Sequence, residues 1–114
     1  MSTIQVQQMS PDVCVAPQLT PDAMKAVADA GFKSIINNRP DFEGGADQPT
    51  SAQMEAAAEA AGLVYAFLPV APGFQSPEEI ARFGELLATL PHPILAFCRT
   101  GTRSGKLFRA ATGA

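Results

Sequence analysis

The segment Ile94-Leu95-Ala96-Phe97-Cys98-Arg99-Thr100-Gly101-Thr102-Arg103-Ser104 carries the strongest fold signal in this sequence. Its first four residues are apolar, which indicates a buried strand, and the residues from Ser104 to about Thr112 are predicted to form a helix. A strand that turns directly into a helix leaves unpaired N–H groups at the positive end of the helix dipole. Because such groups bind anions, the segment predicts a strand, an anion-binding loop and a helix.

Cys98 lies at the edge of this predicted loop, where the same electrostatic field favours a thiolate nucleophile. Arg103 adds a permanently charged fork that suits bidentate binding of an oxyanion. Ser104 is expected to cap the helix or to steady the thiolate. We therefore predict that Cys98 and Arg103 are catalytic. The substrate-binding residues predicted from the loop are Arg99, Thr100, Gly101, Thr102 and Ser104.

Strand and helix signals alternate along the rest of the chain, which we expect to form a single domain over residues 1–114. Strands are predicted at Val13–Ala16, Phe32–Ile36, Leu63–Val70 and Ile94–Phe97, and helices at 20–31, 50–61 and 76–90. This alternation predicts an α/β fold with a mostly parallel sheet of four to five strands and helices on both faces. Ligands of such sheets bind beyond the carboxyl ends of the strands, so loops 37–49, 71–75 and 99–103 are expected to meet there.

The amino-acid composition argues against several classes of function. The 114 residues carry a net charge of −3, which gives no general attraction to nucleic acid or to an anionic membrane. No apolar stretch approaches the roughly 20 residues of a membrane span, and we expect a cytoplasmic protein. His92 is the single histidine, so no metal site or other cofactor is expected. Cys14 is predicted to be an ordinary strand residue rather than a disulfide partner of Cys98.

The sequence resembles the phosphatase-like domain of beta-lactamase hydrolase-like proteins, bacterial relatives of dual-specificity phosphatases. The segments that carry the resemblance are 16–19, 31–41, 69–70 and the Cys98–Ser104 loop. The resemblance implies a three-layer sandwich like that of protein tyrosine phosphatases and rhodaneses, with Cys98 as nucleophile and Arg103 as anion clamp. In some family members the domain looks like a sulfurtransferase fused to a persulfide dioxygenase, so a fused or separate persulfide dioxygenase is an implied partner.

Three departures from the phosphatase pattern favour sulfur transfer. Phosphatases place five residues between cysteine and arginine, whereas this chain places four, as rhodaneses do. Phe97 stands where phosphatases usually have histidine, and Ala71-Pro72-Gly73 lacks their general-acid aspartate. An ester leaving group gains a factor of roughly 10² to 10⁴ from such an acid. A thiosulfate-like donor expels sulfite and needs none.

The leading hypothesis is therefore a rhodanese-like sulfurtransferase of sulfide metabolism, in which Cys98 carries a persulfide from a small anionic donor such as thiosulfate. Two alternatives stay open. The first is a phosphatase that forms a phosphocysteine on a phosphate ester, with Asp41 or Glu43 replacing the missing acid. The second is a non-catalytic, anion-binding regulatory module. Arg39 is predicted to bind substrate, although an ion pair of Arg39 with Asp41 would also order the loop.

Overall fold

The computed structural model describes residues 4–113. In chain order its elements are β1 (Gln7–Ser10), β2 (Val13–Ala16), the short 3-10 helix η1 (Pro21–Ala23), α1 (Met24–Asp29), β3 (Ser34–Asn37), α2 (Ser51–Ala60), β4 (Val64–Phe67), α3 (Pro77–Thr89), β5 (Ile94–Phe97) and α4 (Thr102–Thr112). No helix among these residues is long and apolar enough to cross a membrane.

The strands form one five-stranded sheet in the order β1-β2-β5-β3-β4. The pairs β2–β5, β5–β3 and β3–β4 are parallel, and only β1 is antiparallel to its neighbour. The predicted α/β fold with a mostly parallel sheet is thus confirmed. All four predicted strands are present, whereas β1 was not foreseen because Gln7 and Gln8 are exposed and give no apolar signal.

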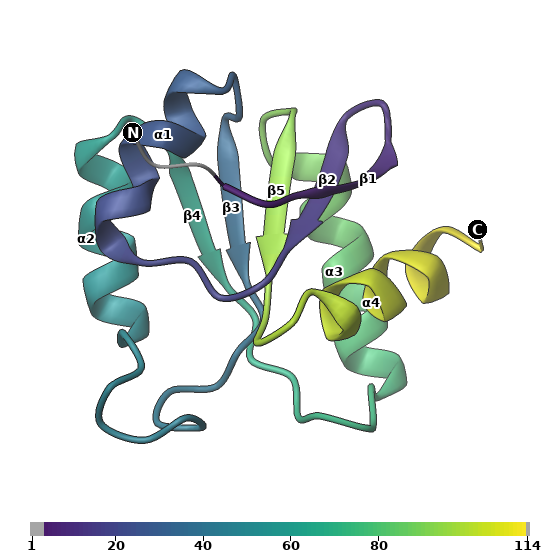
Figure 1. Ribbon diagram of the computed structural model, residues 1–114. Coiled ribbons are helices and arrows are strands. Elements are labelled where there is room, and N and C mark those ends of the chain that lie inside the picture. Colours follow the sequence, from purple (N-terminus) through teal and green to yellow (C-terminus); the bar gives the residue numbers. More distant parts are fainter. Residues whose placement is uncertain (1–3, 114) are drawn as a thin grey trace.

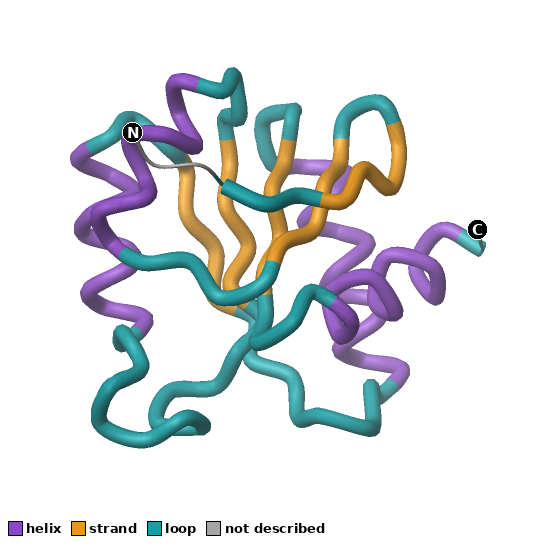
Figure 2. Tube along the Cα trace, in the orientation of Figure 1, coloured by secondary structure: helices purple, strands orange, loops and turns teal. Residues whose placement is uncertain are grey.

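Helices cover both faces of the sheet, with α1 and α2 on one side and α3 and α4 on the other (Figures 1 and 2). The core under α3 and α4 consists of Val13, Val15, Ile36, Val70, Phe83, Leu86, Ile94, Ala96, Leu107 and Phe108. The core under α1 and α2 consists of Ala16, Leu19, Met24, Val27, Ile35, Met54, Ala58, Leu63, Leu95 and Phe97. Alternate residues of β5 therefore enter opposite cores, which explains why this strand reads as a continuous apolar run.

Side-chain caps fix where two of the helices begin. Thr50 and Gln53 form a capping box at α2, and Ser76 and Glu79 form one at α3, as the sequence indicated for α3. Helix α4 differs, because its N-cap is Gly101 in the left-handed conformation and no side chain caps it. Since α4 begins at Thr102, the predicted start at Ser104 was two residues late and Ser104 is no cap.

Hydrogen bonds join the loops that follow β2, β3, β4 and β5. The Asn38 amide donates to the Phe97 carbonyl at 2.8 Å, and the Val70 amide donates to the Asn38 carbonyl at 3.0 Å. On the other side of β5, the Gln18 amide donates to the Arg99 carbonyl at 3.1 Å. The sheet pairing therefore continues past the strand ends. As a result, four loops meet at the carboxyl edge, at the bottom of Figure 1.

Candidate active site

Cys98 is the first residue after β5 and is 1% exposed. The N–H of Gly101 donates a hydrogen bond to its Sγ at 3.0 Å. The chain therefore turns back over the sulfur within three residues, as an anion loop must. A backbone N–H aimed at sulfur stabilises negative charge on it, so the predicted position of Cys98 at the loop fits the structure.

Gly101 makes this turn possible. Its φ is +92°, a left-handed value that side chains with a Cβ disfavour. A Cβ built at this position would also lie 3.3 Å from the carbonyl carbon of Ala16 at the end of β2. Both the backbone conformation and the close approach to Ala16 therefore require glycine here.

The first turn of α4 directly follows the cysteine loop and has backbone N–H donors of its own. The Thr102 amide donates to the Thr100 hydroxyl at 3.4 Å, and the Gly105 amide to the Gly101 carbonyl at 2.9 Å. The amides of Arg103 and Ser104 have no acceptor within residues 4–113. Two N–H groups at a helix N-terminus are thus available for an anion.

Arg103 is buried and holds a carboxylate of the protein. Its guanidinium donates to both carboxylate oxygens of Glu43, at 3.0 and 3.1 Å, and to the Val70 carbonyl at 3.0 Å. The bidentate geometry expected for a substrate oxyanion is therefore present, with Glu43 as the acceptor. Arg39 donates to the same carboxylate at 2.9 Å, so Glu43 lies between two arginines.

The two arginines decide the charge of Glu43. Burial raises the pKa of this carboxyl, but the hydrogen bonds from Arg103 and Arg39, with their positive charges, outweigh burial and lower the pKa below its ordinary value. Glu43 is therefore ionised at neutral pH. In this arrangement it orients Arg103 and has no proton to donate to a leaving group.

Two further predicted site residues, Asp41 and Arg39, are bound to other parts of the protein. Asp41 accepts the Ser51 amide at 2.7 Å, so its carboxylate stabilises the start of α2. Arg39 donates to Glu43 and, at 3.1 Å, to Gln18. The ion pair expected between Arg39 and Asp41 is absent from this structure, because Arg39 pairs with Glu43 instead. The roles predicted for Asp41 in catalysis and for Arg39 in substrate binding stay predictions.

Ser104 is fully buried, and its hydroxyl donates to the Asn38 side chain at 2.8 Å. Asn38 in turn donates to the Leu68 carbonyl at 3.0 Å. A hydroxyl has one proton, so Ser104 does not donate to Cys98 while this bond is formed. The bond ties the first turn of α4 to the loop after β3.

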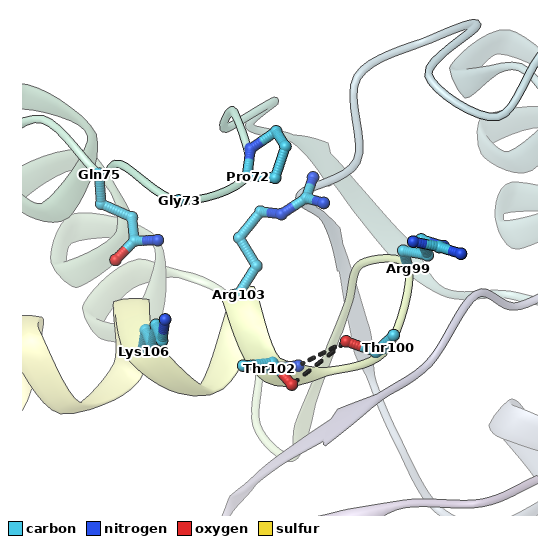
Figure 3. A pocket seen from close by; sticks show the side chains of 8 residues that line it. All are labelled: Pro72, Gly73, Gln75, Arg99, Thr100, Thr102, Arg103 and Lys106. Atoms are coloured by element: carbon cyan, nitrogen blue, oxygen red, sulfur yellow. Dashed lines mark hydrogen bonds between the residues drawn. The ribbon is translucent and has the colours of Figure 1, made fainter.

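A pocket of about 200 Å³ opens on the outer side of the cysteine loop (Figure 3). It is lined by Pro72, Gly73, Gln75, Arg99, Thr100, Thr102, Arg103 and Lys106. The predicted substrate-binding residues Arg99, Thr100 and Thr102 are thus together on one surface. Gly101 and Ser104 are buried and do not line this pocket.

Sequence reasoning missed how the site is supported. Glu43 was considered only as an acid, and Asn38 was given no role of its own. Their contacts join residues 60 and 66 positions apart in the chain. The available signal was the run of polar residues directly after β3, since parallel strands place such residues beside the cysteine loop.

A cysteine, an anion loop and an arginine at the carboxyl edge of a mostly parallel sheet define the class of protein-tyrosine-phosphatase-like folds. The family "Beta-lactamase hydrolase-like protein, phosphatase-like domain" matches residues 5–113, and the chain belongs to it. The expected family and fold are thereby confirmed.

Relatives of known sequence include beta-lactamase hydrolase-like proteins. The one from Agrobacterium fabrum is 42% identical over 78 residues, which cover 68% of this chain and 18% of that protein. The one from Xylella fastidiosa is 35% identical over 96 residues, which cover 84% of this chain and 22% of that protein. The chain therefore spans about a fifth of the length of these relatives.

Two solved structures are also similar. A candidate phosphatase from Neisseria meningitidis is 34% identical, has a TM-score of 0.82, and shares 89% of this chain and 71% of its own. A variant of Pseudomonas aeruginosa TpbA in complex with pTyr is 16% identical, has a TM-score of 0.68, and shares 93% of this chain and 62% of its own. At 16% identity, the similarity to the TpbA variant shows a shared fold and nothing about function.

Proposed function

We propose that this domain is a cysteine-dependent hydrolase of phosphate monoesters. The observation that carries the proposal is the Gly101 N–H that donates to Cys98 Sγ, with the free amides of Arg103 and Ser104 in the turn of α4 that follows. Membership in a phosphatase-like family and the 34% identity to the Neisseria meningitidis structure support it.

The proposed cycle has two displacements. Cys98 thiolate attacks phosphorus, an S–P bond forms, and the P–O ester bond breaks with its electron pair going to the leaving oxygen. A water oxygen then attacks the phosphocysteine, the S–P bond breaks, and phosphate leaves while the thiolate is restored. The loop amides hold the phosphoryl oxygens in both steps, because they point at a fixed position and need no reorganisation.

Within residues 4–113, the acidic groups of the loops near Cys98 are unsuited to donate a proton in the first step. The residues at 71–73 are Ala-Pro-Gly, Glu43 has a lowered pKa, and Asp41 is bound to the start of α2. We therefore propose that substrates have weakly basic leaving groups, such as phenols, which depart without protonation. The rate should then fall steeply as the pKa of the leaving group rises.

Sulfur transfer is the second candidate. Two observations favour it: four residues separate Cys98 from Arg103, and the site has no acid, which a sulfite leaving group does not need. In that cycle the Cys98 thiolate takes the outer sulfur of thiosulfate and sulfite leaves with the electron pair. A thiophile such as cyanide then removes the sulfur and restores the thiolate.

One experiment compares the two. Purified protein is assayed for hydrolysis of p-nitrophenyl phosphate and, in parallel, for thiocyanate formation from thiosulfate and cyanide. We expect phosphate release, loss of at least about 10³-fold in Cys98→Ser, and no such loss in Cys14→Ser. Cys14 is a matched control because burial raises the pKa of its thiol and it lies in β2, away from the loop.

Two other outcomes of these assays would favour the alternative functions. Thiocyanate formation that depends on Cys98, without phosphate release, would replace the phosphatase by the sulfurtransferase. Inactivity in both assays, with phosphate still protecting Cys98 from alkylation, would indicate the anion-binding module.

A further inference from the structure

Two cationic side chains line the pocket without an ionic partner. Arg99 and Lys106 are exposed, and neither lies within 4.0 Å of a carboxylate among the side chains of residues 4–113. Arg103, by contrast, is already bound to Glu43. The pocket therefore has two cations that its own walls leave uncompensated.

No aspartate or glutamate lines this pocket, although the whole chain has a net charge of −3. The remaining lining consists of hydroxyl groups, the Gln75 amide and the apolar Pro72-Gly73 turn. Figure 3 shows the Gln75 side chain directed from this turn toward α4, where Lys106 lies. The positive potential is thus local to the pocket and accompanied by neutral donors, an arrangement that favours an anion.

The position of the pocket indicates which part of a substrate enters it. The pocket borders the cysteine loop, because Arg99, Thr100, Thr102 and Arg103 line it, although Cys98 itself does not. A phosphoryl group that the loop holds at Cys98 is therefore expected next to this wall. The ester substituent then extends toward Gln75 and Lys106. The volume of about 200 Å³ is below the roughly 300 to 1,000 Å³ of sites for drug-sized ligands, so only a small substituent fits.

We propose that the pocket binds a second anionic group, a carboxylate or a phosphate, on the leaving-group part of a small phosphomonoester, with Lys106 as a specificity-determining residue. This inference rests on the proposed phosphatase function and narrows its substrate class. Lys106 is about one turn of α4 beyond Arg103 along the backbone, and it lines the same pocket as Arg103.

The test compares 4-carboxyphenyl phosphate with its uncharged analogue 4-carbamoylphenyl phosphate. We expect Lys106→Gln to lower the ratio of kcat/KM for the carboxylate to kcat/KM for the carboxamide about threefold to fivefold. Comparing ratios between variants cancels the difference in leaving-group pKa. Arg109→Gln is the matched control, since it removes an exposed positive charge from the same helix outside the pocket.

An equal fall of the ratio in Arg109→Gln would overturn the proposal, because it would indicate the general field of the helix. An unchanged ratio in Lys106→Gln would overturn it as well. 1,4-Phenylene bisphosphate replaces the carboxylate substrate in a parallel arm, and the larger loss of the two identifies the anion that the pocket prefers.

A binding measurement covers the case in which no ester is hydrolysed and the proposed function fails. Affinities of 4-carboxybenzyl and 4-carbamoylbenzyl phosphonate are measured on Cys98→Ser by calorimetry, with and without Lys106→Gln. A preference for the carboxylate that depends on Lys106 would support the pocket as a second anion site without turnover. Equal affinities, or no binding of either phosphonate, would overturn it.

Discussion

The loops after β3 and β5 follow neighbouring parallel strands and meet at the site, yet they are built differently. The loop after β5 covers residues 98–101 and turns at the left-handed Gly101, whose N–H donates to Cys98. The loop after β3 covers residues 38–50 and is held by side chains. There Gln48 accepts the Gly44 amide at 2.7 Å and donates to the Pro40 carbonyl at 2.9 Å.

The difference suggests that the short loop binds the anion, whereas the long loop orients Arg103. A short loop with fixed dihedrals aims its N–H groups at one position, which suits an anion of any substrate that the site accepts. The long loop brings one side chain, Glu43, to Arg103 in the first turn of α4. We therefore expect changes in the short loop to affect turnover most, and changes in the long loop to act through Arg103.

The largest effect is expected where the two loops join. Arg103→Lys keeps the charge but cannot hold both oxygens of Glu43 or of a phosphoryl group. We predict a loss of about 10²-fold in kcat/KM for p-nitrophenyl phosphate. Urea unfolding serves as the control for folding. A fully folded Arg103→Lys with near wild-type kcat/KM would remove Arg103 from the catalytic residues.

Glu43→Gln tests the long loop. Loss of the carboxylate leaves Arg39 and Arg103, both nearly buried, without their anion, and we expect a cost of about 2 kcal/mol in unfolding free energy. Because Arg103 is less well oriented, kcat/KM should fall about tenfold. Asp47→Asn, an exposed change in the same loop, is the control. Activity unaffected by Glu43→Gln would refute the orienting role.

The same variant has a predicted pH dependence. The folded state lowers the pKa of Glu43, so the unfolded state binds more protons in the acid range. The contribution of Glu43 to stability is therefore complete above the ordinary value of 4.5 and is lost as the pH falls below it. Urea unfolding should show a larger difference between wild type and Glu43→Gln at pH 7 than at about pH 3.

Gly101→Ala tests the short loop without changing any functional side chain. An alanine at φ +92°, with its Cβ 3.3 Å from the backbone of Ala16, should cost roughly 2 to 3 kcal/mol. Gly62→Ala is the matched control, since Gly62 has φ +84° and nothing within 4 Å, and it should cost only about 1 kcal/mol. Equal changes in the urea midpoints would show that the approach to Ala16 has no energetic weight.

The smallest effect is expected for Ser104→Ala. The change leaves the Asn38 oxygen without its donor in a fully buried position, at a cost of about 1 kcal/mol. Turnover should change less than stability, because the Ser104 proton is used by Asn38 and not by Cys98. A double-mutant cycle with Asn38→Ala measures the coupling. A loss of turnover much larger than for Asn38→Ala would assign Ser104 to the sulfur instead.

Much of the cysteine loop could be predicted, because its parts are contiguous in the sequence. The apolar run before Cys98 indicated β5, and the residues after it indicated a loop and a helix. The start of α4 was misplaced because Gly101, in a left-handed conformation, replaces the usual capping side chain. Strand β1 was missed because its pairing with β2 is the only reason that its polar residues are extended.

The sequence by itself determined the order of strands and helices from β2 onward and the family, and it placed Cys98 and Arg103 at one strand-to-helix junction, because each depends on residues close together in the chain. Only the tertiary structure decided what those residues contact. In the folded protein Arg103 donates hydrogen bonds to Glu43, Asp41 accepts the Ser51 amide at the start of α2, and Ser104 donates to Asn38. Local patterns set the backbone, whereas the choice of an ionic partner depends on which loops the parallel sheet brings to one edge.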